Sequence, residues 1–253
     1  MRHDSTIYPD PRFAIVTASS NGPDGAGAEP AVVAAALQTP PHRLVLALPD
    51  NAAGIDHLAD ELAADHLPGV VGPSAAARRF AQRWTARTGQ KMEAGMAERT
   101  FRLRTVRQQA PGPGQMRVAR TSDRNLLEGW LRAFAAEALG ETFENAAEAA
   151  GRWISGRGRT MYFWDHDDRT VSMCGAGGQT PNGIRVGPVY TPPAERGQGY
   201  ATSLVAVCSQ VQLDEGHASV FLFTDRANPT SNRIYESIGY EPVIDVDQYD
   251  FLD

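Results

Sequence analysis

Apolar positions in the first half of the chain predict short strands that alternate with helices. Strands are expected at 13–17, 44–48, 67–71 and 91–106, and helices at 31–37, from Asp50 or Asn51 to about 65, and from Ser74 to Gly89. In the last of these helices Ala76, Phe80 and Trp84 recur every four residues and predict one buried face. This alternation is typical of an α/β domain.

A linker is predicted at 111–115, because Pro111, Gly112, Pro113 and Gly114 interrupt every periodicity. It separates an N-terminal domain, 1–110, from a second domain, 116–253. In the second domain strands are expected at 116–120, 160–164, 171–176, 183–190, 218–224 and 241–251, with two helices between 121 and 153, one after 199 and one at 229–238. The pattern predicts a mixed sheet flanked by helices, an α/β (α+β) fold.

The composition, 42% hydrophobic and 21% charged residues, is typical of a soluble globular protein. No apolar run approaches the roughly 18 residues of a membrane span, and the first residues show no signal-peptide core, so we expect a cytoplasmic protein without a membrane partner. Cys174 and Cys208 are too few for a disulfide framework and are expected as buried free thiols. The histidines lack partners at metal-ligand spacing, so no metal is expected.

Charge is distributed unevenly. Residues 1–115 carry 12 basic and 11 acidic groups, whereas residues 116–253 carry 12 and 19. An acidic second half favours a cationic or amine-bearing partner over a polyanion. Basic residues concentrate at 78–107, where a nucleic-acid patch is one reading. We favour a solvated helix face, because no row of aromatic residues accompanies the charge, and expect no nucleic-acid partner.

The strand at 183–190 leads into a turn that suits an anion. Pro188 predicts an edge, a bulge or a splayed ladder. Arg196, Gly197 and Gly199 follow, immediately before a helix. Glycines let the backbone approach a ligand, and the first amides of a helix lack intrahelical partners, so the turn is suited to a diphosphate.

Two motifs resemble those of one family. Arg196-x-x-Gly199-x-Ala201 resembles the acyl-CoA pyrophosphate signature of the GNAT superfamily of acetyltransferases. Asn228-Pro229, followed by Tyr235 and Gly239-Tyr240, resembles the closing element of the same family. The resemblance implies the GNAT acyl-CoA N-acyltransferase fold, acetyl-CoA as co-substrate, and N-acetyl transfer to an amine. It also implies a homodimer as one option, because members often dimerise.

The resemblance further implies the site residues. The cofactor-binding residues would be Val189, Tyr190, Arg196, Gly197, Gln198, Gly199, Tyr200, Ala201, Thr202 and Asn228. Tyr235 occupies the position of the general acid, although a helix tyrosine of this kind also packs on a core. Glu137 is the candidate general base, with a pKa raised by burial against Phe134. A solvent-facing carboxylate is the alternative reading of Glu137, and the base could instead be Tyr190, Asp225 or a relayed water. We expect His166, in a hairpin turn, to be exposed.

The sequence leaves three questions open. The acceptor could be a small molecule or a protein amino group. A CoA-binding regulatory or scaffolding module without turnover is the rival to an enzyme. The segment from Pro73 through Phe80 to Gly89 parallels that from Pro229 through Tyr235 to Gly239. The first domain could therefore be a degenerate copy of the second, although two independently capped helices explain the parallel as well.

Overall fold

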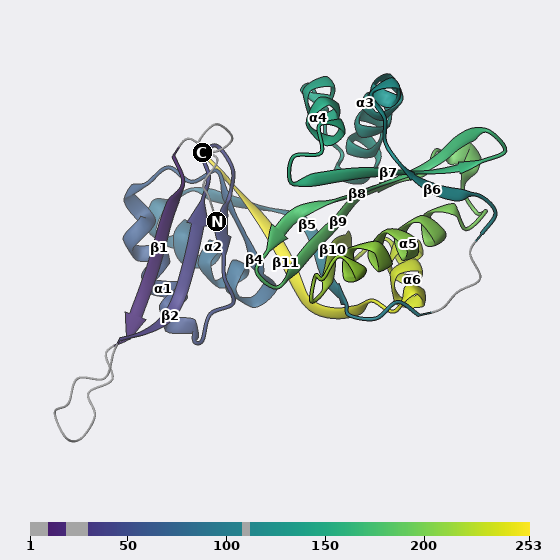
Figure 1. Ribbon diagram of the computed structural model, residues 1–253. Helices are drawn as coiled ribbons and strands as arrows, with labels where there is room; N and C mark the ends of the chain where they lie inside the picture. The colour runs from purple at the N-terminus through teal and green to yellow at the C-terminus, as the bar shows by residue number, and fades with distance from the viewer. Residues whose placement is uncertain (1–9, 19–29, 108–111) are drawn as a thin grey trace. The chain divides into compact units, whose positions relative to one another are not determined.

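The computed structural model describes residues 10–18, 30–107 and 112–253 (Figure 1). The chain divides into two compact units. Unit 1 comprises Met1–Glu98 and Ile244–Asp253, and unit 2 comprises Arg99–Val243. Two strands, β5 (Lys91–Leu103) and β11 (Glu241–Leu252), supply residues to both. The predicted linker lies partly outside the described residues, and the predicted boundary there remains a prediction.

Unit 1 is a sheet with two helices on one face (Figure 1). Its remaining elements are β1 (Arg12–Ala18), β2 (Ala31–Gln38), β3 (Leu44–Leu46), α1 (Ala52–Glu61), a 3₁₀ turn (Leu62–Ala64), β4 (Gly69–Pro73) and α2 (Ser74–Thr88). The strands are ordered β1-β2-β3-β4-β11, and only β3 and β4 pair in parallel. Phe80 and Trp84 of α2 are fully buried against this sheet, as the four-residue spacing predicts.

The helix predicted at 31–37 is wrong, because these residues form the strand β2. An alanine-rich run has high helix propensity, but β2 pairs with β1 on one side and with β3 on the other. Its alternate residues Ala34 and Ala36 pack into the core below the sheet. Tertiary pairing therefore overrides the local preference.

The two predicted helix starts differ in outcome. Asn51 is the N-cap of α1, where its side-chain oxygen accepts a hydrogen bond of 3.0 Å from the amide of Gly54. Ser74 is not a cap. Pro73 occupies the N-cap position of α2, and the Ser74 hydroxyl is buried without a hydrogen-bond partner among the described residues. Proline's fixed φ suits the start of a helix, although proline offers no side-chain acceptor.

The basic face of α2 is neutralised by α1. Arg79 forms two hydrogen bonds with Asp56, and Arg83 forms two with Asp60. Arg87 also pairs with Asp60, at 3.0 Å. These ion pairs agree with the reading of a solvated helix face, because paired guanidinium groups leave less charge for a polyanion.

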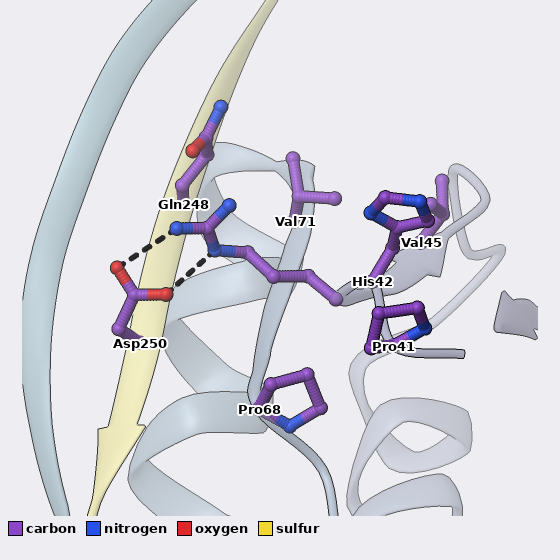
Figure 2. Close-up of a pocket in the computed structure, with 8 residues that line it drawn as sticks. Pro41, His42, Val45, Pro68, Val71, Gln248 and Asp250 are labelled. Atoms are coloured by element: carbon purple, nitrogen blue, oxygen red, sulfur yellow. Dashed lines mark hydrogen bonds and ion pairs between the residues drawn. The ribbon is translucent and has the colours of Figure 1, made fainter. Parts of the chain in front are cut away.

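A groove of about 370 Å³ lies on the face of the unit 1 sheet (Figure 2). Asp250 of β11 accepts two hydrogen bonds, of 2.7 and 2.9 Å, from the guanidinium of Arg43. Both are drawn as dashed lines from the labelled Asp250 in Figure 2. Val45, Val71 and Gln248 contribute the wall formed by the strands. None of the site residues predicted from the sequence lines this groove.

Unit 2 contains a mixed sheet between two pairs of helices. The strands are β6 (Gln115–Val118), β7 (Arg159–His166), β8 (Arg169–Thr180), β9 (Gly183–Tyr190) and β10 (Val220–Asp225), in the order β10-β9-β8-β7-β6. The helices are α3 (Arg124–Phe134), α4 (Ala146–Ile154), α5 (Tyr200–Asp214) and α6 (Pro229–Ile238). A π-helical turn, Ala135–Leu139, continues α3, and 3₁₀ turns lie at Thr121–Asp123 and Pro193–Glu195. Of the neighbours in this strand order, β9 and β10 pair in parallel, and the other three pairs are antiparallel. The expected α/β (α+β) fold is confirmed.

Alternate residues of β7 fill the two cores of unit 2. Met161 and Phe163 pack against α3 and α4, whereas Tyr162 and Trp164 pack against the layer of α5 and α6. In Figure 1 the two helix pairs lie on opposite faces of the sheet. The two-residue period of a strand produces this division.

Both cysteines lie in the core on the α5 side. Cys174 of β8 and Cys208 of α5 are fully buried free thiols, as expected. A hydrogen bond between the two thiols, together with burial, raises the pKa of Cys174 well above its ordinary value. The Cys174 thiol is therefore a packing group and a poor nucleophile.

None of the described helices combines the length and the apolar character that crossing a membrane requires.

The two segments that parallel each other in sequence adopt similar local structures. In unit 1, β4 leads into α2, which ends at Gly89 with φ of 78°. In unit 2, β10 leads into α6, which ends at Gly239 with φ of 112°. A glycine in the left-handed region is a common helix terminator, so a shared origin of the two segments stays a prediction.

Candidate functional site

The strand β9 is bulged and splayed where Pro188 predicts it. A cis peptide bond joins Gly187 and Pro188, and the register with β8 shifts between Cys174 and Ala176. On the other side, the registered pairs with β10 end at Arg185, which lies opposite Phe221. Among the described residues, β9 therefore has no registered partner on the β10 side from Val186 onward. An extended ligand can align with a strand that is left unpaired in this way.

The turn after β9 presents open backbone amides. Gly197 and Gly199 both have φ of 79°, a region that other residues rarely adopt, and both are exposed. A Cβ added at either position would meet no atom within 4 Å. Gly199 is the N-cap of α5, and no side chain caps that helix. The first amides of α5 are thus available to an anion at the positive end of the helix dipole.

The other residues predicted for this turn follow the helix geometry. Gln198 is exposed, Tyr200 is buried, and Ala201 and Thr202 are half-buried on the first turn of α5. The ring of His166 lies 5.5 Å from the ring of Tyr200. The expectation that His166 is exposed is wrong, because this contact leaves only 24% of its side chain accessible.

Arg196 points at Glu137. Its Nη2 donates to Glu137 Oε2, and its Nε donates to the backbone oxygen of Thr191 at 2.9 Å. The Tyr190 hydroxyl donates to the other carboxylate oxygen of Glu137, at 3.1 Å. The guanidinium carbon also lies 5.8 Å from the centroid of the Tyr190 ring. Glu137, Tyr190 and Arg196, all predicted site residues, therefore form one cluster, although Glu137 and Arg196 are 59 positions apart.

The expected rise in the pKa of Glu137 is wrong. The hydrogen bond from Arg196 lowers the pKa of Glu137; desolvation opposes this, and the hydrogen bond from Tyr190 adds to the lowering, so the net pKa is below the ordinary value. The side chain is 42% exposed, so burial is too slight to dominate. Glu137 is accordingly an ionised carboxylate and a weak base.

Sequence reasoning missed the aromatic neighbour of this cluster. The half-buried Trp130 of α3 lies 6.0 Å from Tyr190 and 5.7 Å from Phe163, measured between ring centroids. Its helical spacing only indicated a core position. Burial, together with the hydrogen bond to Glu137, raises the pKa of Tyr190, which argues against this phenol as a base near neutral pH.

Tyr235 is a buried phenol on α6. Its ring packs against Phe101 and Tyr240 at centroid distances of 6.3 and 5.9 Å, and its hydroxyl has no hydrogen-bond partner among the described residues. Burial raises the pKa of Tyr235 far above its ordinary value, and the neighbouring Cys174 adds to the rise. Cys174 lies directly opposite Val189 in the sheet. Tyr235 is therefore a protonated group close to the unpaired part of β9.

Asn228 is the N-cap of α6. Its side-chain oxygen accepts from the amide of Ser231 at 3.0 Å. The Asn228 oxygen thus caps the helix, and a contact from its amide group to a ligand stays a prediction.

The segment before β6 reaches the first turn of α5, which the sequence did not indicate. The amide of Gly112 donates to the Ser203 hydroxyl at 2.7 Å. The indole of Trp164 donates to the carbonyl of Pro113 at 2.9 Å. These contacts fix residues 112–113 beside the glycine turn, where a side chain at position 112 would meet Ser203 at 3.0 Å.

The arrangement fits an acyl-CoA. An uncapped helix start with two open glycines suits the diphosphate, and the unpaired side of β9 suits the extended pantetheine arm. The described residues contain no group of three or more His, Cys, Asp or Glu side chains that could hold a metal ion.

Comparisons with known proteins agree with this reading. Residues 125–240 match the model of the acetyltransferase (GNAT) family. An acetyltransferase from the GNAT family of Colwellia psychrerythraea is similar in structure, with 12% identity, a TM-score of 0.59, and coverage of 87% of this chain and 82% of that chain. A GCN5-related N-acetyltransferase from Kribbella flavida has 15% identity, a TM-score of 0.56, and coverage of 87% and 86%. A Drosophila protein has 13% identity, a TM-score of 0.65, and coverage of 97% and 80%. No curated protein matches the chain.

The chain shares its fold with acetyltransferases of known structure. Residues 125–240 form a domain of the acetyltransferase (GNAT) family. This match supports acetyl transfer from an acyl-CoA in general.

Proposed function

We propose that the chain is an acetyl-CoA-dependent N-acetyltransferase that moves an acetyl group directly to a primary amine. One observation carries the proposal: the buried, protonated Tyr235 lies near the part of β9 that has no registered partner on the β10 side. The same unit contains the start of α5, where the backbone amides are open. A general acid and an anion site in one unit support turnover and not binding alone.

Each step has a candidate residue. Acetyl-CoA supplies an activated thioester carbonyl to the attacking amine. The backbone amides at the start of α5 hold the diphosphate, and the amide of Val189 donates to the carbonyl oxygen as negative charge develops, which is worth about 3 kcal/mol in other enzymes. Tyr235 donates its proton to the departing thiolate. Glu137 is ionised and can take the ammonium proton through a water, although its lowered pKa makes this transfer weak.

Thiol release tests the proposal. We would incubate wild type and Tyr235→Phe with acetyl-CoA across a mixed set of amines, with a no-acceptor control. Acceptor-dependent release should fall by about 100-fold in the variant, the range of general acid catalysis. Tyr249→Phe is the matched control, because both phenols are 9% exposed and Tyr249 lies in unit 1. Equal release by Tyr235→Phe and wild type would contradict the role of Tyr235.

The second candidate is a CoA-binding regulatory or scaffolding module. The observation that favours it is the exposed, ion-paired Glu137, which leaves the site without a strong base. If the module is correct, Tyr235→Phe should leave function unchanged, whereas Gly199→Glu should abolish it by placing a carboxylate at the anion site. Binding of acetyl-CoA without thiol release would support the module.

A further inference from the structure

The ion pair between Arg196 and Glu137 is weak, while a separate hydrogen bond from Arg196 Nε to the backbone oxygen of Thr191 holds the base of the guanidinium. The ion pair is exposed, with 49% of the Arg196 side chain and 42% of the Glu137 side chain accessible. Exposed ion pairs contribute little to stability, because water screens both charges. The pair can therefore be exchanged for a stronger partner at small cost.

A diphosphate at the glycine turn would be that stronger partner. Arg196 directly precedes Gly197, and three residues later Gly199 begins α5 with open amides. Guanidinium groups bind phosphates through two parallel hydrogen bonds, and such charge-assisted bonds are among the strongest in proteins. Glu137 and the diphosphate thus compete for one cation.

We propose that Arg196 is a positioning residue that pairs with Glu137 while the glycine turn is empty and turns to the diphosphate when CoA binds. The inference rests on the proposed function, because it needs a CoA diphosphate at the turn. As a consequence, CoA binding moves Arg196 away and exposes one oxygen of the Glu137 carboxylate and the face of the Tyr190 ring.

The uncapped groups suit a cationic acceptor. The carboxylate of Glu137 and the aromatic ring of Tyr190 already hold one cation, the guanidinium of Arg196. An ammonium group can make the same two interactions once Arg196 has left. Because linkage is reciprocal, CoA and a cationic amine should strengthen each other's binding, by at most about fivefold for an exposed ion pair.

Calorimetric titration with two probes tests the exchange. CoA carries the diphosphate, and pantetheine lacks it. Glu137→Gln should bind CoA about two- to fivefold more tightly than wild type, because the carboxylate no longer competes with the diphosphate for Arg196. Pantetheine binding should not change. Glu137→Asp, whose shorter side chain reaches Arg196 less well, should shift CoA affinity in the same direction and guards against a folding defect in one variant.

The Arg196→Gln background separates exchange from simple removal of a negative charge. In that background Glu137→Gln should leave CoA affinity unchanged. The proposal is overturned if Glu137→Gln fails to tighten CoA binding, or if the tightening persists without Arg196. If wild type binds no CoA at all, the proposed function fails together with this inference. Binding of CoA without any effect of Glu137 overturns the inference alone.

Discussion

Arg117 joins three elements of unit 2 through two carboxylates. Its guanidinium contacts Asp123, at the turn before α3, at 2.6 Å, and Asp165 of β7 at 2.5 Å. Only 18% of the Arg117 side chain and 13% of the Asp123 side chain are accessible. Desolvation alone would raise the pKa of Asp123, but hydrogen bonds from Arg117 and from the amide of Arg120 prevail and lower it. The network fixes the start of the helix that leads to Glu137.

Asp123→Asn should destabilise unit 2 by about 3 kcal/mol, because it leaves a largely buried guanidinium with one carboxylate fewer. The pKa of Asp123 is lower in the folded chain than in the unfolded chain. The pair therefore stabilises the fold above the ordinary carboxyl pKa, and this contribution is lost as the pH falls through the folded pKa. Urea unfolding between about pH 7 and about pH 3 should show the two curves converging in acid.

Asp214→Asn is the control for that series, because Asp214 is exposed at the end of α5. It should change the free energy of unfolding by less than about 0.5 kcal/mol at every pH. An equal loss of unfolding free energy in both variants would mean that the Arg117–Asp123 pair contributes no more than an exposed carboxylate.

At the level of single residues, the sequence predicted local geometry better than environment. Gly197, Gly199 and Tyr235 follow from motifs whose spacing is local, so their positions could be inferred directly. The pairing of Arg196 with Glu137 could not, because it joins residues 59 positions apart and depends on the turn at Ala135–Leu139, which carries Glu137 out of the α3 register. Helix α2 begins at Ser74 as predicted, with Pro73 in its N-cap position.

Among the elements, the start of α5 combines strain and function. Gly199→Ala should cost about 1 kcal/mol of stability, because a Cβ disfavours a φ of 79° even where space is open. The same change should also weaken CoA binding if the α5 amides hold the diphosphate, since relief of the strain re-aims those amides. Urea unfolding and calorimetry with CoA would measure the two effects separately.

Gly156→Ala is a matched control for this change. Gly156 has φ of 69° and equally open surroundings, but it follows α4 and not the glycine turn. It should lose similar stability and keep full CoA affinity. If both variants bind CoA like wild type, the turn is not the anion site.

Strands and helices were predicted well where local pattern and pairing agree. The strands of unit 2 and its four helices follow from the spacing or the runs of their apolar residues and from the breaks at their ends. The segment 31–37 failed because its alanines carry no β-branched or alternating signal, and only the partners β1 and β3 define it as a strand.

For the whole molecule, the end of β11 packs into the core of unit 1, which the sequence did not indicate. The expected second domain extended to residue 253, yet Tyr249 and Phe251 pack into the core of unit 1. The ring of Phe251 stacks on Trp84 at a centroid distance of 5.4 Å. Nothing in the spacing of residues 241–251 reveals which of the two cores they join.

Phe251→Ala should therefore destabilise unit 1 by about 3–4 kcal/mol, the usual cost of deleting a buried aromatic ring. Hydrogen exchange should accelerate in α2 and β4, while α5 of unit 2 exchanges as in wild type. Leu252→Ala, on the next residue and 44% exposed, should leave both units unchanged. Uniform acceleration in α2 and α5 would mean that the two units unfold together.

The return of β11 to unit 1 also sets the order in which the two units can fold during synthesis on the ribosome. Residues 99–243 form one uninterrupted stretch, so unit 2 has all its parts as soon as that stretch has emerged. Unit 1 must wait for residues 244–252 to complete its sheet, with the edge of β4 unpaired in the meantime. Unit 2, which follows most of unit 1 along the chain, can thus finish folding before unit 1 does.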